Sequence, residues 1–265
     1  MTESRLIDKL GNLRKQKSKV FCAFLTLGYP NLGATEKLIK AFDREGVDII
    51  ELGFPFSDPL ADGPTIQYSS EKALARGVTL RDAFGLAKKL RRQGCRIPIL
   101  FFSYLNPIYR YGIRAFAKKA AASGFDGVIV PDLPPEEETG FQHDCRRYGL
   151  AQVFLVTPTT AQPRARAIAR KCRGFIYYVS LRGVTGARRN ISADVRRHLA
   201  VLEKDTDKPV LVGFGVSSPK QAKFLSGLSE GVIVGSAIID RLRKSSGKTG
   251  PAIAYIRSMV RAVKS

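Results

Sequence analysis

The chain has 265 residues and a mass of 29.1 kDa, a length that one barrel-type domain commonly fills. Its apolar fraction of 44% and charged fraction of 25% exclude a disordered or fibrous chain, and no apolar run reaches the roughly 18 residues of a membrane-spanning helix. The net charge is +21, from 44 Lys and Arg against 23 Asp and Glu. A charge this high is common in nucleic-acid-binding proteins, so that class has to be considered.

The basic residues are spread along the whole chain, mostly in stretches of helical pattern without interleaved aromatic residues. This distribution indicates a solvated basic surface that attracts anions in general, and it favours neither a nucleic-acid nor a membrane partner. The N-terminus MTESRLIDKL has no apolar signal core, so we expect a cytoplasmic protein. Four dispersed cysteines and two histidines form no clustered ligand set, so we expect free thiols and no metal.

The first predicted element is a helix over 5–14, with Leu6, Leu10 and Leu13 on one face, that closes the bottom of the fold. Eight short apolar runs follow, and they are continuously apolar rather than alternating, which is typical of strands covered on both faces. Their ranges are 20–26, 47–53, 97–103, 127–132, 151–157, 174–180, 209–215 and 231–237.

Amphipathic stretches lie between these runs, with room for a helix each time. One of them is spaced by Leu38, Phe42 and Gly46. Eight strands alternating with helices predict an α/β fold, a (β/α)8 TIM barrel forming a single domain over 1–265. We expect a short extra helix over 236–244 after the eighth strand and a final helix over 251–263. The alternative is a doubly wound sheet with the same local pattern, but eight recurring units favour closure.

In such barrels the site lies at the C-terminal ends of the strands. Glu51 interrupts the second apolar run, where a buried carboxylate is costly unless it is paired or neutral. It is either a structural ion-pair member or a carboxyl of raised pKa that acts as acid and base. The following loop, 55–67, carries Asp58 and Asp62, which form Asx-turns or converge with Glu51 on one ligand.

Glycines follow the last three runs, at Gly183 and Gly186, at Gly213 and Gly215, and at Gly235. Glycines let backbone N–H groups approach phosphate oxygens, and loops of this kind with a short helix commonly form the phosphate site of this barrel. The strand ends offer no lysine for a Schiff base and no dinucleotide fingerprint. Carboxylates alone indicate proton transfer: an isomerisation, elimination or retro-aldol cleavage of a phosphorylated substrate.

Several segments together resemble the tryptophan synthase alpha subunit family over essentially the whole length. They are AFLTLGYP (23–30), ELGFPFSDPLADGPTIQ (51–67), SYLNPIYRYG (103–112), PDLPPEE (131–137), IYYVSLRGVTGAR (176–188), GFGVSSP (213–219) and VGSAII (234–239). The resemblance implies a (β/α)8 lyase that cleaves indole-3-glycerol phosphate to indole and glyceraldehyde 3-phosphate without a cofactor. It also implies a complex with a beta subunit that consumes the indole, in which two copies of each chain assemble.

Carried over by position, the resemblance implies that Glu51 is the acid/base and Asp62 the second catalytic carboxylate. Substrate-binding residues implied in the same way are Phe24 and Leu100 in the indole pocket, Tyr177 beside the glycerol chain, Thr185 in a closing loop, and Gly186, Gly213, Phe214, Gly215, Gly235 and Ser236 around the phosphate. The turns at 55–58, 104–107 and 131–135 are expected to face the beta subunit.

Three alternatives stay open at this stage. A sugar-phosphate isomerase would share the glycine loops but not the 55–67 segment. A stand-alone lyase that releases free indole would have the same catalytic residues, so only partner binding discriminates. A nucleic-acid binder on the same barrel is suggested by the net charge alone.

Overall fold

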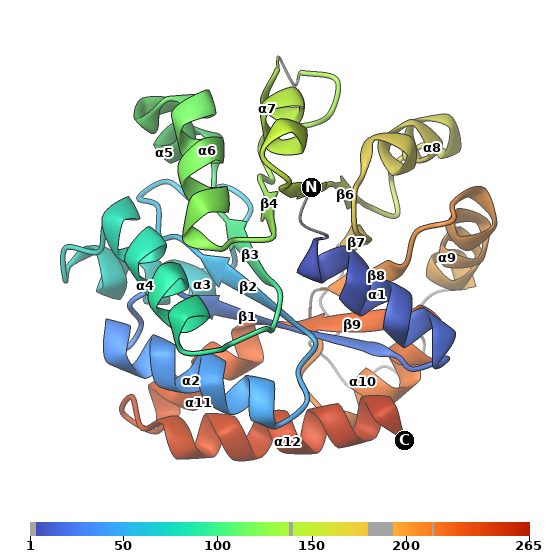
Figure 1. The fold of residues 1–265 in the computed structure, drawn as a ribbon. Helices are drawn as coiled ribbons and strands as arrows, with labels where there is room; N and C mark the ends of the chain where they lie inside the picture. The colour runs from blue at the N-terminus through green and yellow to red at the C-terminus, as the bar shows by residue number, and fades with distance from the viewer. Residues whose placement is uncertain (1–3, 138–139, 180–192, 214) are drawn as a thin grey trace.

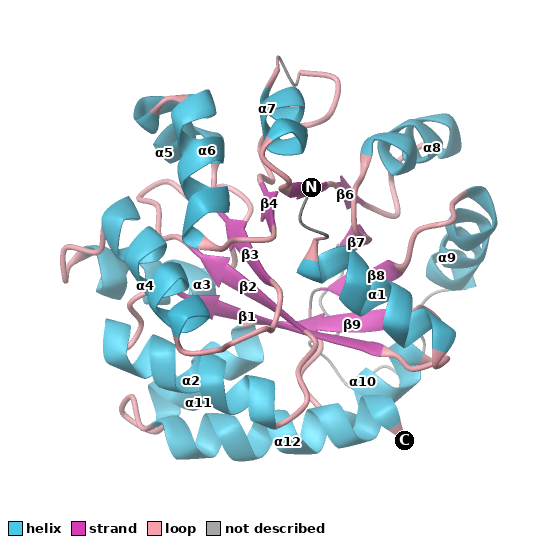
Figure 2. Cartoon of the chain, in the orientation of Figure 1, coloured by secondary structure: helices cyan, strands magenta, loops and turns pink. Residues whose placement is uncertain are grey.

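The computed structural model describes residues 4–137, 140–179, 193–213 and 215–265. Within these residues, nine parallel strands form one sheet, and helices surround it (Figures 1 and 2). The strands are β1 (Val20–Thr26), β2 (Ile49–Gly53), β3 (Ile99–Phe102), β4 (Gly127–Ile129), β5 (Ala151–Val153), β6 (Leu155–Val156), β7 (Ile176–Val179), β8 (Val210–Gly213) and β9 (Gly231–Val234).

The order of the strands closes the sheet into a barrel. It runs β5-β4-β3-β2-β1-β9-β8-β7-β6, and the two outermost strands, β5 and β6, are consecutive pieces of one extended segment. β5 pairs with β4, whereas β6 pairs with β7. The predicted (β/α)8 barrel is therefore confirmed, and the doubly wound alternative is wrong.

The predicted single strand over 151–157 is interrupted at Phe154. At this residue the segment changes from one neighbouring strand to the other. Its N–H donates to the Cys172 sulfur at 3.2 Å, and its carbonyl accepts from Tyr177 N at 3.1 Å. The interruption satisfies both backbone groups while the segment changes partners.

Twelve helices lie among the described residues, and most of them cover the outside of the barrel (Figure 2). They are α1 (Arg5–Lys15), α2 (Leu32–Arg44), α3 (Pro64–Leu74), α4 (Leu80–Arg92), α5 (Leu105–Tyr111), α6 (Ile113–Ser123), α7 (Phe141–Arg147), α8 (Gln162–Lys171), α9 (Ala193–Asp205), α10 (Pro219–Ser226), α11 (Ser236–Lys244) and α12 (Thr249–Lys264). No helix in the described part of the chain is long and apolar enough to cross a membrane.

Three features of the helices bear on the predictions. The short helix expected over 236–244 is α11, with the same bounds. Gly46, which the sequence spacing assigned to a helix, lies beyond the end of α2 with a φ of +85°, a left-handed conformation that favours glycine and ends the helix. The helices α3 and α5, inserted after β2 and β3, were not predicted. They position the two loops that carry Asp62 and Tyr104.

Two apolar cores hold the barrel together. The larger core lies between the sheet and the outer helices. The smaller core fills the barrel interior, where Leu6, Leu10 and Leu13 of α1 pack against inward-facing strand residues. Figure 1 shows α1, in dark blue, lying across one end of the barrel. The expectation that this helix closes the barrel bottom is therefore confirmed.

Ion pairs anchor α1 at that end. Arg5 lies 2.8 Å from the carboxylate of Asp126, which also binds Arg91 at 2.7 Å. Lys9 pairs with Asp48 at 3.3 Å, and Asp48 in turn pairs with a lysine of α12. Both aspartates are almost fully buried, so their pairing removes the cost of an isolated buried charge.

Candidate active site

A cavity of about 320 Å³ opens at the C-terminal ends of the strands. It contains six residues that the sequence predicts for the site: Phe24, Asp62, Tyr177, Gly215, Gly235 and Ser236. The other residues that line it are Gly63, Pro64, Thr65, Ile66, Phe102, Val216, Ser217, Ile233, Ala237 and Asp240. The lining residues come from β1, β3, β7, β9, α3, α11 and the loops after β2, β8 and β9, so the fold brings distant segments to one place.

Glu51 lies beneath this cavity, inside the barrel. Its Cα pairs with those of Phe24 on β1 and Leu100 on β3. The side chain is fully buried. Its Oε1 accepts a hydrogen bond from the Cys22 thiol at 3.5 Å, and Oε2 has no partner among the described residues. Burial raises the pKa of Glu51 to about 8, so the carboxyl is mostly protonated at neutral pH.

A structural ion pair does not explain Glu51, since no basic side chain of the described residues contacts it. A neutral carboxyl in a dry interior can donate a proton, which fits the acid/base interpretation.

Asp62 lines the cavity from the loop between β2 and α3. The side chain is half-buried, and desolvation raises its pKa to about 6, while a hydrogen bond with Tyr104 opposes the rise. The Tyr104 hydroxyl also accepts from Ala61 N at 2.9 Å, which ties the loop to β3's C-terminal end. At neutral pH Asp62 is mostly ionised, and it can accept a proton or a hydrogen bond from a ligand.

Aromatic side chains form one wall of the cavity. The rings of Phe24 and Phe102 meet edge to face, with centroids 5.5 Å apart. A side chain at Gly53 would overlap the Phe24 ring, and one at Gly213 would approach Tyr177 to 2.5 Å. These glycines therefore make space for the protein's own rings.

Sequence reasoning missed Phe102 and placed Leu100 in the pocket. Leu100 is fully buried in the inner core and does not line the cavity. Both residues face inward because side chains two apart on a strand share a face. That spacing, applied from Leu100 toward the C-terminal end of the strand, indicates Phe102 as the residue nearer to the opening.

Another part of the cavity wall suits an anion. α11 begins there, with Gly235 at its N-cap and Ser236 and Ala237 in its first turn. Gly215 has a φ of +79° and joins Val216 and Ser217 on the cavity wall. Among the described lining residues there is no lysine or arginine. The backbone N–H groups and the helix dipole at the start of α11 are the features of this wall that suit an anion.

Three residues of the expected site, Thr185, Gly186 and Phe214, lie outside the described residues. Within the described part of the chain, no group of three His, Cys, Asp or Glu side chains is arranged to hold a metal ion.

The loops after β2, β3 and β4 are joined at the rim. The rings of Phe56 and Tyr104 lie 5.5 Å apart. Leu105 N donates to both oxygens of Asp132, at 2.9 and 3.1 Å. Together with the bond from Ala61 N to Tyr104, these contacts connect the three loops in series. The loop that holds Asp62 is therefore in contact, through Tyr104, with the loop after β3.

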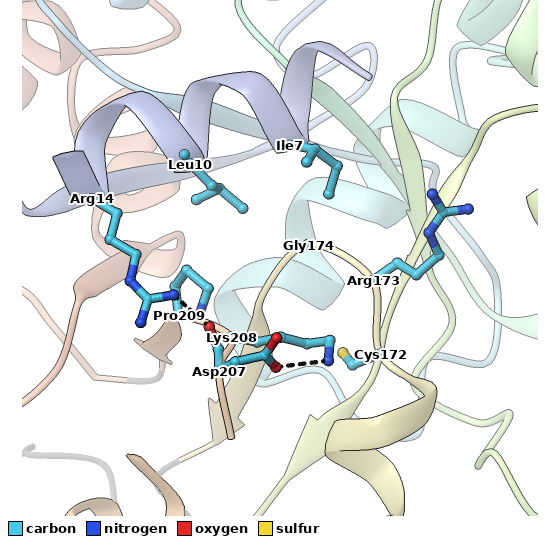
Figure 3. A pocket seen from close by; sticks show the side chains of 10 residues that line it. Ile7, Leu10, Arg14, Cys172, Arg173, Gly174, Asp207, Lys208 and Pro209 are labelled. Atoms are coloured by element: carbon cyan, nitrogen blue, oxygen red, sulfur yellow. Dashed lines mark hydrogen bonds and ion pairs between the residues drawn. The ribbon is translucent and has the colours of Figure 1, made fainter. Parts of the chain in front are cut away.

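A second hollow, of about 290 Å³, lies under α1 at the opposite end of the barrel (Figure 3). Arg14 donates to the carbonyl of Asp207 at 2.7 Å, and the Asp207 carboxylate pairs with Lys208 at 3.2 Å. No residue that the sequence predicts for the site lines this hollow. Its contacts fasten α1 to the barrel, at the end that contributes stability rather than catalysis in this fold.

The fold and the site define a class of protein: a (β/α)8 enzyme for proton-transfer chemistry on a phosphorylated substrate. Comparison with known proteins narrows this class. The family model of the tryptophan synthase alpha chain matches residues 10–264. The alpha chain of Geobacter sulfurreducens is 44% identical over 259 residues, 97% of this chain and 98% of that one. That of Geotalea daltonii is 46% identical over 92% of both chains.

Solved structures agree with the sequence comparison. The tryptophan synthase alpha chain of Legionella pneumophila superposes with a TM-score of 0.90 at 32% identity, covering 99% of this chain and 98% of that chain. A chain of Mycobacterium tuberculosis tryptophan synthase gives a TM-score of 0.90 at 35% identity, covering 99% of both chains. The chain belongs to the tryptophan synthase alpha chain family. It is a carbon–carbon lyase that cleaves indole-3-glycerol phosphate to indole and glyceraldehyde 3-phosphate in tryptophan biosynthesis.

Proposed function

We propose that Glu51 and Asp62 carry out the cleavage as a pair of carboxyl groups with opposite protonation states. The observation that carries the proposal is the difference in their surroundings. Glu51 is fully buried with a pKa of about 8, whereas Asp62 borders the cavity with a pKa of about 6. Between these two values Glu51 is mainly an acid and Asp62 mainly a base.

The reaction is a reversed aldol. Asp62 accepts the indole N–H and stabilises the positive charge that develops on the ring when C3 is protonated. Glu51 supplies that proton to C3. The bond between C3 and the side chain then breaks, and its electron pair returns to the indole ring. Glu51 takes the proton of the side-chain hydroxyl as the aldehyde forms, which restores its starting state.

The aromatic wall and the start of α11 position the substrate. Phe24 and Phe102 contact the flat indole, and Tyr177 lies beside the glycerol chain. The phosphate binds the backbone around Gly215 and Gly235, with Ser236 as a further donor. Thr185, Gly186 and Phe214 complete the site as the family resemblance implies. Holding the substrate at both ends supplies part of the rate acceleration, because the reacting atoms are already aligned.

The alpha chain works with the beta subunit of tryptophan synthase. We place the docking surface at the joined rim loops 55–58, 104–107 and 131–135, because they surround the cavity mouth. Leu60, on the same loop as Asp62, is 92% exposed and gives this rim an apolar contact point. A biosynthetic complex of this kind fits the cytoplasmic location expected from the sequence.

The test supplies indole-3-glycerol phosphate to the full chain, alone and with a beta subunit, and measures indole and glyceraldehyde 3-phosphate. We expect both products in equal amounts and a faster reaction with the beta subunit. Unequal products, or cleavage that survives the combined changes Glu51→Gln and Asp62→Asn, would show that other groups carry the reaction.

A further inference from the structure

Cys22 makes a contact that the cleavage mechanism above does not use. It lies on β1, with its side chain in the barrel interior and no solvent exposure. Its Sγ donates to Oε1 of Glu51 at 3.5 Å. The second carboxyl oxygen, Oε2, is equally buried and has no hydrogen-bond partner among the described residues. The two oxygens of the proposed acid therefore have different surroundings.

The other groups around Glu51 do not compete for Oε1. Tyr177 on β7 is a titratable group that interacts electrostatically with Glu51, and no hydrogen bond joins the two side chains in the described structure. Leu100 on β3 and Phe24 on β1 are apolar, and α1 presents leucines to the interior. Asp48, near the strand's start, acts on the Cys22 thiol and not on Glu51.

We propose that Cys22 is a positioning residue for Glu51: its thiol donates to Oε1, so that Oε2, which has no partner among the described residues, carries the acid proton. The inference rests on the proposed role of Glu51. It adds that a residue of β1 determines which carboxyl oxygen of Glu51 reacts. If the two oxygens had the same surroundings, rotation about the terminal side-chain torsion would exchange them.

The contact also has an electrostatic consequence. A donor to the carboxylate favours the ionised form, so the thiol lowers the pKa of Glu51 against the rise caused by burial. In return, burial and the neighbouring carboxyl raise the pKa of the Cys22 thiol well above its usual value. The sulfur therefore keeps its proton over the working pH range and remains a donor.

The experiment measures kcat for cleavage of indole-3-glycerol phosphate against pH in the full chain and in the variants Cys22→Ala and Cys22→Ser. Activity falls at high pH as Glu51 ionises. We call this fall in kcat the alkaline limb of the pH profile. Without the thiol donor, we expect the alkaline limb of Cys22→Ala to lie roughly half to one unit higher in pH. In Cys22→Ser a hydroxyl replaces the thiol as donor, so the limb stays near that of the parent chain.

The fall in kcat at low pH, the acid limb, reflects protonation of Asp62. We expect it to lie at the same pH in both variants, so it serves as an internal reference. Cys172→Ala is the matched control, because it removes a buried thiol that donates to the Phe175 carbonyl and not to a carboxyl. It is expected to lower the melting temperature without moving either limb. Melting temperatures of all variants show whether each has folded.

The outcomes separate this inference from the proposed function. A folded Cys22→Ala whose alkaline limb coincides with the parent's overturns the positioning role while leaving Glu51 as the acid. Movement of the limb in Cys172→Ala as well overturns it too, since any buried thiol would then suffice. Retained turnover in Glu51→Gln would instead contradict the proposed function itself.

Discussion

Glu51 and Asp62 differ in one respect that determines their chemistry: how much water each carboxyl loses on folding. Glu51 has no exposed surface, and in the described part of the chain a single weak donor contacts its side chain. Asp62 borders the cavity and accepts from Tyr104. The same functional group thus becomes an acid at one position and a base at the other, eleven residues along the chain.

Replacing either carboxyl by its amide tests these roles. Glu51→Gln keeps the size of the side chain but cannot transfer a proton, so we expect kcat to fall by about 10²–10⁴ with little change in substrate affinity. Asp62→Asn removes the acceptor for the indole N–H and is expected to be similarly severe. Stopped assays of indole release, with binding measured by titration, check both values. Near-normal turnover in one variant would remove that residue from the mechanism.

The pH dependence of cleavage follows from the two pKa values. Asp62 must be ionised, so activity is lost as pH falls through about 6. Glu51 must be protonated, so activity is lost as pH rises through about 8. We therefore expect a bell-shaped profile of kcat with its maximum near neutral pH. A plateau that extends well above pH 8 would contradict an acid role for Glu51.

At the scale of elements, some bounds could be predicted from the sequence and others could not. The run 20–26 is β1, because six apolar residues follow Lys19 and the run ends at Thr26. The helix α11 fills 236–244, directly after Gly235. The interruption at Phe154 depends on neighbours about 25 residues away on each side, which no local pattern reports. The buried position of Glu51 was predictable, whereas its contact with Cys22 requires the register of β1 and β2.

The helix α1 is expected to contribute strongly to stability through its inward face. Leu6 is fully buried in the inner core, so Leu6→Ala should lower the free energy of unfolding by about 2–5 kcal/mol. The neighbouring Ile7 is 41% exposed, and Ile7→Ala serves as the control with a much smaller effect. Denaturant titration of both variants measures the difference. Equal losses would show that α1 does not plug the barrel as described.

The joined rim loops predict how the partner influences catalysis. Asp132→Ala removes the acceptor of Leu105 N and disconnects the loop after β4 from the loop after β3. We expect activation by the beta subunit to fall about fivefold or more, with basal cleavage less affected. The measurement is the ratio of the rates with and without the beta subunit. An unchanged ratio would show that these loops do not transmit the partner's effect.

For the whole molecule, the net charge of +21 is the feature that the cleavage reaction does not require. A field of this size acts over long distances at low salt and is screened at high salt. We expect the association rate with the beta subunit to fall by roughly tenfold or more between about 0.01 M and about 1 M ionic strength. A rate that is independent of salt would show that the basic surface does not steer the encounter.

The central claim is that a protonated Glu51 and an ionised Asp62 coexist in one folded barrel at neutral pH. Carbon-13 NMR of the full chain, labelled at the side-chain carboxyls of Glu and Asp, measures this directly. We predict one glutamate signal that titrates near pH 8 and is lost in Glu51→Gln, and one aspartate signal that titrates near pH 6 and is lost in Asp62→Asn. A Glu51 signal that titrates near its ordinary value of about 4.3 would contradict the account.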